Sequence, residues 1–259
     1  MFVRLLIAAV ALAACGSPRP AIDPIGDPMT AAPGQLAQVV VLGTIHAGHR
    51  ASRGYSLPVL REIIRAVKPD VVLTEIPPDR LGPALAQFRA EGSVSEARVV
   101  RFPEYTEALF PLLDELGVEV VGCSAWTAEM ADERRTAEAR LRIERPAEAS
   151  EVDAAISAAE KRLADLGDDP SRIHSDEYDA IVTAGMEPYD RLWNDALGAG
   201  GWSNINKAHL ALIGAAIEAR PTRPLRTLVM FGAWHKGPLR AGLTARTDVE
   251  LVELASFWP

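Results

Sequence analysis

The sequence has little cysteine and no surplus of basic residues, and both shortages exclude classes of protein. Its 259 residues contain two cysteines, Cys15 and Cys123, so a framework of several disulfides is excluded. The net charge is −8, and no cluster of lysine and arginine is interleaved with aromatic residues. Because nucleic-acid recognition usually requires a basic face, we expect no nucleic-acid partner. Acidity also serves solubility, so it identifies no partner of its own.

The apolar run near the N-terminus, Leu5–Ala14, is too short to span a bilayer comfortably. It follows a short charged start and precedes small residues, as in a secretory signal. Its end, Leu-Ala-Ala-Cys at 12–15, resembles the bacterial lipobox, in which the cysteine is lipidated and becomes the mature N-terminus. By resemblance to Gram-negative lipoproteins, Gly16 favours the outer membrane. We expect a signal peptide at 1–15 and a lipid anchor at Cys15 facing the periplasm; the alternative is an ordinary signal peptide with an incidental cysteine.

Beyond this signal, residues 16–38 are rich in proline, alanine and glycine and lack periodicity, which predicts a flexible tether. From residue 39 onward, apolar runs alternate with helical patterns, which is typical of a parallel α/β sheet flanked by helices. We therefore predict a single α/β domain over 39–259. The expected strands are 39–42, 71–73, 118–121, 226–231 and 249–254, and the expected helices are 58–67, 83–90, 103–116 and 203–219.

The middle of the chain, about 127–200, has a different composition. It is dense in alanine, glutamate, arginine and aspartate and has few strand-forming residues. This predicts a helical insertion between the third strand and the last strands, interrupted at Gly185 and Pro188. The insertion could cap the ends of the strands, or it could be a solvated hairpin without a function.

Two matching stretches lie at opposite ends of the predicted domain. VVVLGTIH ends in Gly43 and His46, and LVMFGAWH ends in Gly232 and His235. Each is an apolar run that predicts a buried strand followed by Gly-x-x-His. A glycine there lets the backbone turn sharply and approach a ligand. Since ligands bind beyond the carboxyl ends of parallel strands, we expect both histidines at one edge of the sheet.

A third stretch, DVVLTEIPPDR, places Glu75 at the end of another strand. A carboxylate there is costly unless a charged partner or a metal satisfies it. Two imidazoles and a carboxylate suit a divalent transition metal, and three protein ligands with an open position would activate water for hydrolysis. We expect His46, Glu75 and His235 to be the catalytic residues and to hold Mn, Co or Zn, or else to form an acid/base site. His49 could be a fourth ligand or a general base.

Taken together, the Gly-Thr-x-His start, KPDVVLTEIPPDR and the late Gly-x-x-His resemble the TraB/Tiki superfamily, which is related to the erythromycin-esterase and ChaN-like folds. The resemblance covers residues 39–80 and 206–240 and leaves out the helical middle. It implies a parallel α/β core with both histidines and the glutamate at one site. It also implies a metal-dependent hydrolase, because Tiki members are described as metal-dependent proteases. Together with the lipobox, this leads us to expect a hydrolase of the cell envelope that acts on a peptide, an ester or a related bond of a peptide or small-molecule substrate.

The sequence departs from that family in two places. Many relatives carry an Arg-Asn pair on the helix before the last motif, whereas here Ile205 precedes Asn206. An arginine there could bind a carboxylate or stabilise an oxyanion, so Arg53, Arg80 or Lys236 could substitute for it. We therefore expect Arg53, Arg80 and Asn206 to bind substrate. ChaN-like and esterase relatives also carry glutamate where this chain has a threonine after Gly43.

The alternative function is a haem- or metal-binding lipoprotein without catalysis, as in ChaN-like proteins. A haem site needs an exposed histidine or tyrosine beside an apolar patch, and Tyr55 and His49 are the candidates. A degenerate site in a structural domain is a third possibility. We expect a structural role for Glu104, which begins a helix. We do not expect His174 and His209 to be ligands, because they lie in polar helical segments.

Overall fold

The computed structural model describes residues 36–219 and 226–258. The predicted signal peptide, the lipobox cysteine Cys15 and most of the predicted tether therefore lie outside the described residues. The first strand begins at Ala37, so the last two residues predicted for the tether belong to the sheet. None of the helices within the described ranges has the length and apolarity needed to cross a membrane.

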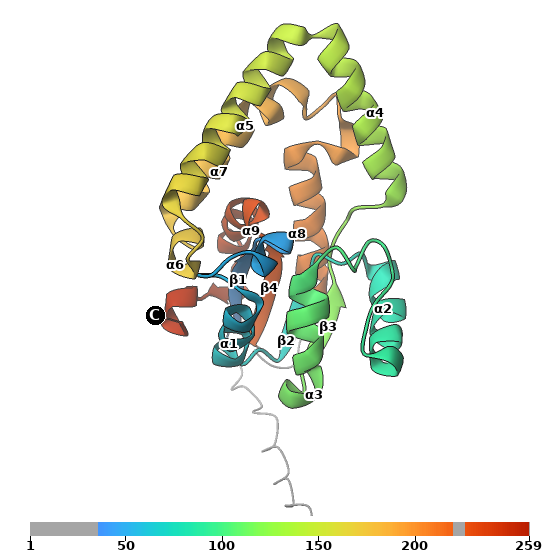
Figure 1. The fold of residues 1–259 in the computed structure, drawn as a ribbon, viewed down its shortest axis with the longest axis vertical. Coiled ribbons are helices and arrows are strands. Elements are labelled where there is room, and N and C mark those ends of the chain that lie inside the picture. Colours follow the sequence, from blue (N-terminus) through green and yellow to red (C-terminus); the bar gives the residue numbers. More distant parts are fainter. Residues whose placement is uncertain (1–35, 220–225, 259) are drawn as a thin grey trace, which may run out of the picture. The chain divides into compact units, whose positions relative to one another are not determined.

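Five strands within the described ranges form one sheet in the order β3-β2-β4-β1-β5, and every neighbouring pair is parallel (Figure 1). The predicted parallel α/β core is thereby confirmed. Each predicted strand is present, with ends that differ by up to three residues from those predicted. Their bounds are β1 Ala37–Thr44, β2 Val71–Thr74, β3 Glu119–Gly122, β4 Arg226–Gly232 and β5 Val249–Leu251.

Helices cover both faces of this sheet, and alternate residues of β1 show how. Val40 and Leu42 pack with residues of α1, Leu57–Val67. Val39 and Val41 pack with residues of α8, Trp202–Glu218, and α9, Ala233–Thr244. Because both faces are buried, the strands are continuous apolar runs rather than alternating ones.

The helical segment predicted at 103–116 is irregular. It consists of a π-helical turn at Glu104–Leu109, a 3₁₀ turn at Phe110–Leu112 and the short α3 at Leu113–Leu116. Single π-helical turns are rare and often lie at functional sites. The preceding helix, α2, spans Pro78–Glu91 and so begins earlier than predicted.

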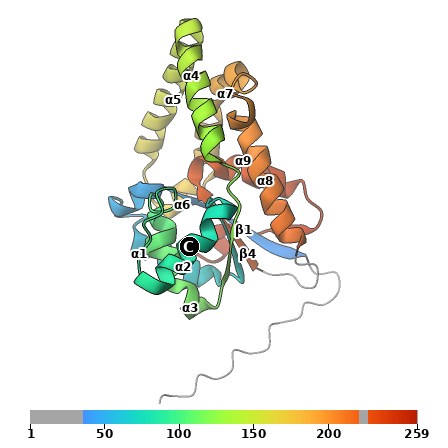
Figure 2. The ribbon, with the colours of Figure 1, turned by 90° about the vertical axis from the view of Figure 1, so that its right-hand side faces the viewer.

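The predicted helical insertion is present and stands at the carboxyl ends of the strands (Figures 1 and 2). It consists of α4 Ala128–Glu144, α5 Pro146–Leu166, the short α6 Pro170–Ile173 and α7 Asp176–Trp193. The predicted break at Gly185 and Pro188 is wrong, because α7 runs through both. Gly185 serves close packing instead: a Cβ there would lie 2.5 Å from the Cβ of Ala159 on α5. α7 therefore continues through its proline while it packs closely against α5.

Candidate functional site

The two Gly-x-x-His motifs end neighbouring strands. In the parallel pair of β1 and β4, Thr44 lies opposite Gly232. On the other side of β4, Thr74 at the end of β2 lies opposite Met230. The residues that follow these three strand ends are thereby brought together, and among them are His46, His235 and Glu75.

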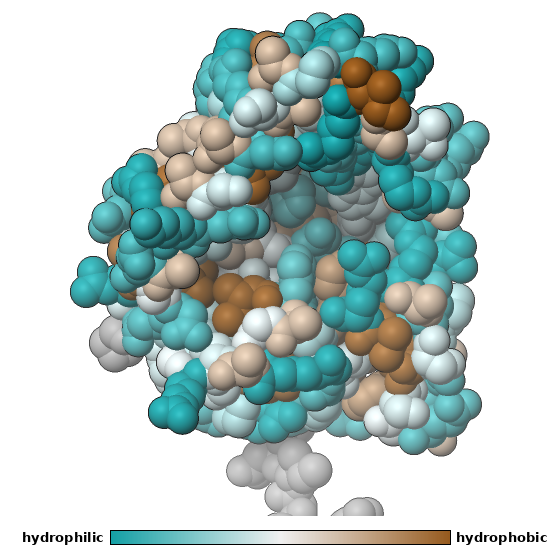
Figure 3. All heavy atoms as spheres, turned by 45° about the horizontal axis from the view of Figure 1, so that its top comes forward, coloured by the Kyte–Doolittle hydropathy of each residue, from teal (hydrophilic) through white to brown (hydrophobic). Residues whose placement is uncertain are grey.

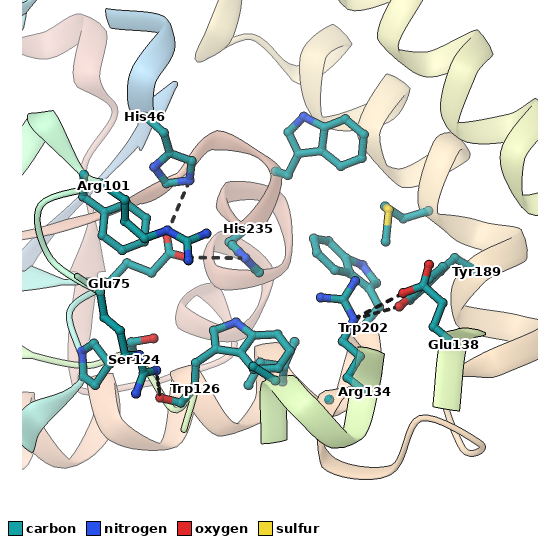
Figure 4. Close-up of a pocket in the computed structure, with 18 of the residues that line it drawn as sticks. His46, Glu75, Arg101, Ser124, Trp126, Arg134, Glu138, Tyr189, Trp202 and His235 are labelled. Carbon is teal, nitrogen blue, oxygen red and sulfur yellow. Dashed lines mark hydrogen bonds and ion pairs between the residues drawn. The ribbon is translucent and has the colours of Figure 1, made fainter. Parts of the chain in front are cut away.

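The carboxylate of Glu75 lies between the two imidazoles (Figure 4). Its Oε2 accepts a hydrogen bond of 2.7 Å from the backbone N–H of Gly232 and lies 4.0 Å from Nε2 of His46. Its Oε1 lies 3.9 Å from Nε2 of His235. Burial disfavours the charged form, so the pKa of Glu75 is raised, although His46 and the Gly232 N–H oppose the shift.

His46 is oriented by a buried acid. Its Nδ1 lies 2.6 Å from Oε1 of Glu104, which also accepts a 3.0 Å hydrogen bond from the hydroxyl of Thr44. A carboxylate only accepts, so Nδ1 carries a proton, and whenever the ring is neutral its Nε2 directs a lone pair toward Glu75. Burial disfavours the imidazolium, but the hydrogen bond to Glu104 and the charges of Glu104 and Glu75 outweigh it, so the pKa of His46 is raised.

The backbone of His46 is also unusual, with φ at +49°. This left-handed conformation is uncommon for a residue other than glycine, and such strain is concentrated at functional sites. The conformation turns the chain sharply beyond the end of β1, where the ring faces the other motif.

His235 is oriented by a buried amide. Nδ1 of His235 lies 2.8 Å from Oδ1 of Asn206, whose Nδ2 donates to the carbonyl of Trp202 and so fixes which side of the amide faces the ring. His235 therefore donates through Nδ1, and its Nε2 lone pair also points toward Glu75. Burial, together with the nearby His209, His46 and Arg134, lowers the pKa of His235 to about 3, so the ring is neutral.

The two motif glycines allow this close approach. A Cβ on Gly232 would lie 2.5 Å from Nε2 of His46, and a Cβ on Gly43 would lie 3.0 Å from the Cα of Ala233. Neither contact is tolerated without a shift. Each motif therefore requires its own glycine in order to fit against the other motif.

Glu104 is a site residue that sequence reasoning placed wrongly. We expected a structural acid at a helix start, yet its side chain is fully buried and contacts His46. The π-helical turn that carries it also carries the buried residues Tyr105, Ala108 and Leu109. The available signal was an acid flanked by apolar residues in FPEYTEALF, because such an acid needs a partner when it is buried.

A cavity of about 530 Å³ opens between these residues and the helical insertion. Figure 3 shows the corresponding hollow in the surface. Its floor includes His46, Glu75 and His235, and α4, α5 and α7 contribute to its wall. The insertion therefore caps the strand ends, which was one of the two expectations for it.

Aromatic and arginine side chains make up much of the cavity lining. The aromatic residues include Trp126, Tyr189, Trp202 and Trp234, and the arginines are Arg98, Arg101 and Arg134. Arg101 is near enough for its charge to act on both His46 and Glu75. Positive charge thus reaches the site from residues other than the ones predicted, although Ile205, at the position of the family arginine, also lines the cavity.

The structure does not support His49 as a metal ligand or general base, nor Tyr55 and His49 as haem ligands. Nε2 of His49 accepts from the backbone N–H of Ile45 and Nδ1 donates to the carbonyl of Tyr55, so neither nitrogen is available. The hydroxyl of Tyr55 donates to the carbonyl of Gly43, and both side chains are buried. The haem alternative thus loses both of its candidate ligands.

The predicted substrate-binding residues are dispersed. Arg53 is exposed and Arg80 pairs with Asp79, and neither lines the cavity. Asn206 is buried and bonded to His235, so its observed role is to orient that ring. Lys236, the other substitute considered, is buried in an ion pair of 2.6 Å with an aspartate of α7.

Whether His46, Glu75 and His235 could hold a metal depends on chemistry and on spacing. Both histidines present Nε2 lone pairs and donate through Nδ1, as metal-bound histidines do, and Glu75 supplies an oxygen donor. Ligand atoms on a tetrahedral metal lie about 3.4 Å apart, whereas the observed separations are 3.9 and 4.0 Å. As placed, no three His, Cys, Asp or Glu side chains in the described residues form a group that could hold an ion. The donor set fits a transition metal, but the spacing is wider than a tetrahedral site allows, so each ring would have to approach Glu75 by at least about 0.5 Å.

No family model matches this sequence, and no curated protein matches it. Among solved structures, a mutant of the erythromycin esterase EreC in its open conformation is similar, with 11% sequence identity and a TM-score of 0.41. The similarity covers 84% of this chain and 69% of that chain.

Proposed function

We propose that this protein is a hydrolase that activates water between His46, Glu75 and His235 to cleave an ester or a peptide bond. The observation that carries the proposal is that Nε2 atoms of two histidines face one buried carboxylate from 4.0 and 3.9 Å. Such an arrangement is unfavourable unless a proton, a water molecule or a cation lies between the carboxylate and the two rings. The side chain of His46 is 39% exposed, so water and substrate can reach it from the cavity.

In the proposed reaction, Nε2 of His46 takes a proton from water while the water oxygen attacks the carbonyl carbon. Glu104 holds the ring through Nδ1 and stabilises the imidazolium that forms. The proton then passes to the oxygen or nitrogen of the leaving group as its bond to carbon breaks. Arg101, whose charge acts on both His46 and Glu75, is suitably placed to stabilise the oxyanion.

In the metal-dependent form of the proposal, His46, Glu75 and His235 would instead hold a divalent Mn, Co or Zn ion, which would lower the pKa of water and polarise the carbonyl, and His46 would then be a ligand and not the base. This metal-dependent form of the proposal is supported by the tautomers of the two histidines, and it also follows from the TraB/Tiki resemblance. The location follows from the lipobox resemblance alone: we propose an enzyme anchored through Cys15 to the outer membrane and facing the periplasm.

The first experiment combines metal analysis with hydrolysis assays on the purified protein and three variants. His46→Ala and His235→Ala should each abolish hydrolysis of chromogenic esters and peptides while circular dichroism stays unchanged. Glu160→Gln is the control, because Glu160 lines the same cavity from an exposed position on α5. The wild-type protein, reloaded with Mn²⁺, Co²⁺ or Zn²⁺, should bind about one equivalent, and the two histidine variants should not.

The outcomes separate the two forms of the proposal. Activity without metal, lost in both histidine variants, would support the acid/base form and exclude the metal-dependent one. Undiminished activity in His46→Ala or His235→Ala would show that hydrolysis does not depend on this site, and the proposal would then be wrong.

A further inference from the structure

We infer that the substrate carries a carboxylate and that Arg134 binds it. This inference rests on the proposed function, because it assigns a substrate class to the same cavity. Arg134 belongs to α4, on the wall contributed by the insertion, and lies across the cavity from His46 and Glu75 (Figure 4). A carboxylate held there would place the rest of the substrate over the reacting groups.

Arg134 is held in position by its neighbours. Its Nε donates a 2.9 Å hydrogen bond to the hydroxyl of Tyr189. The guanidinium lies 5.4 Å from the ring centre of Trp126 and 5.6 Å from that of Tyr189. Its stem passes close to the backbone of Gly200, where a Cβ would lie 2.9 Å from the Cβ of Arg134. A guanidinium ordered in this way loses little conformational freedom when it binds a ligand.

The hydrogen-bonding capacity of Arg134 is not used up by these contacts. Among the described residues, its two Nη groups have no hydrogen-bond partner, since only Nε is engaged. The neighbouring acid, Glu138, lies 3.9 Å from that same Nε and accepts a 3.0 Å hydrogen bond from Arg142 instead. Two parallel N–H groups beside aromatic rings match the two oxygens of a carboxylate.

The other charged groups of the lining are less suited to bind the anion. Arg98 donates a 2.5 Å hydrogen bond to the carbonyl of Trp126, and Arg101 is assigned to the reacting groups. Glu138 is engaged by Arg142, and Glu160 is exposed, so neither offers a buried site for a cationic group. The aromatic residues around Arg134 further favour a substrate in which the carboxylate adjoins an apolar group.

The test measures binding without turnover, in a His46→Ala background. N-acetyl-L-phenylalanine and N-acetyl-L-leucine are titrated beside their uncharged amides, by calorimetry and by quenching of the tryptophans that line the cavity. We expect each acid to bind at least about tenfold more tightly than its amide, which is the effect of a charge-assisted hydrogen-bonded pair. Arg134→Gln should remove this preference, and Arg134→Lys should leave part of it.

Two further variants separate recognition from folding. Arg135→Gln changes the next residue of α4, which is 74% exposed and pairs with Asp132, and should keep the preference. Gly200→Ala leaves the guanidinium intact but displaces its stem, and should reduce the preference. Thermal melts of every variant check that α4 stays folded.

Several results would overturn the inference. Equal binding of acid and amide, a preference that survives Arg134→Gln, or no binding by either pair would each do so. Failure of the hydrolase proposal is distinguishable, since it would appear as acid-selective binding with no hydrolysis by the wild-type protein. Conversely, hydrolysis of neutral and carboxylate-bearing esters with equal kcat/KM would leave the hydrolase intact and remove the carboxylate requirement.

Discussion

Replacing Gly232 by alanine should disable the site while leaving the fold almost intact. The added Cβ would lie 2.5 Å from Nε2 of His46 and 3.3 Å from Oε2 of Glu75, whereas ordinary contact begins at 3.4 Å. The ring of His46 must therefore move by about 0.9 Å. The backbone of Gly232, with φ −51° and ψ 136°, is accessible to alanine, so the ring and not the main chain has to move.

The magnitudes follow from how freely the ring can move. Its side chain is 39% exposed, so it can shift toward the cavity and the free energy of unfolding should fall by only about 1 kcal/mol. A displacement of about 1 Å at a reacting group costs on the order of 100-fold in rate. The shift should also break the 2.6 Å contact between His46 and Glu104. That contact raises the pKa of His46 in the wild-type protein, so the pKa should fall in the variant.

The assay is an NMR pH titration of His46, followed through its Cε1–H signal, beside kcat/KM for any ester that the wild-type protein cleaves. The titration needs no substrate and reports the position of the ring directly. Gly237→Ala is the control, because the nearest atom to its Cβ would be Cγ of Asp179 at 3.4 Å, an ordinary contact. If Gly232→Ala had the wild-type pKa for His46 and full activity, the proposed arrangement of the two motifs would be wrong.

Three further predictions concern buried charge. Glu104→Gln keeps a hydrogen-bond acceptor for His46 but removes the charge, so the pKa of His46 should fall and hydrolysis should drop by about 100-fold or more, measured by NMR titration and kinetics. Burial lowers the pKa of His174 to about 4 from 6.5. Because the unfolded chain takes up the proton first as the pH falls, the free energy of unfolding should fall between pH 6.5 and 4. In urea unfolding at several pH values, His174→Gln should reduce this dependence on pH by up to about 1.4 kcal/mol per pH unit. Lys236→Met leaves Asp179 without its buried ion-pair partner and should lower the free energy of unfolding, measured in urea, by about 3–5 kcal/mol. Much of that loss should be recovered in the double variant with Asp179→Leu.

The strands were predictable from the sequence because both faces of the sheet are covered. Burial on both sides produces runs such as VVVL before Gly43 and LVMF before Gly232, which stand out without any alignment. Two histidines and Glu75 at strand ends could then be placed at one edge of a parallel sheet, and the structure brings them together. The order of the strands was not predictable, since nothing local records that β4 lies between β1 and β2.

The roles of individual polar residues depended on that tertiary arrangement. His49 lies three residues from His46 and has the same chemistry, yet both of its ring nitrogens form hydrogen bonds with the backbone of its own loop. Glu104 lies far from His46 in sequence and is bonded to it. Arg134 is one of many arginines on the insertion, and only the packing of α4 shows that it faces the cavity. Side-chain chemistry therefore suggested the candidates, and the fold decides which of them have a nitrogen or an oxygen available to a substrate or a metal.

The position of β4 has a consequence for how the molecule is made and how it fails. β1 and β2 follow each other in the chain, but both pair with β4, which is synthesised only after the whole insertion. A nascent or truncated chain that stops before Arg226 therefore has a gap in the middle of its sheet and lacks His235. We expect no folded but inactive fragment to accumulate, because loss of the C-terminal segment removes both the central strand β4 and His235. Contacts so distant in sequence also favour slow folding, which leaves the chain open to proteolysis until β4 pairs with β1 and β2.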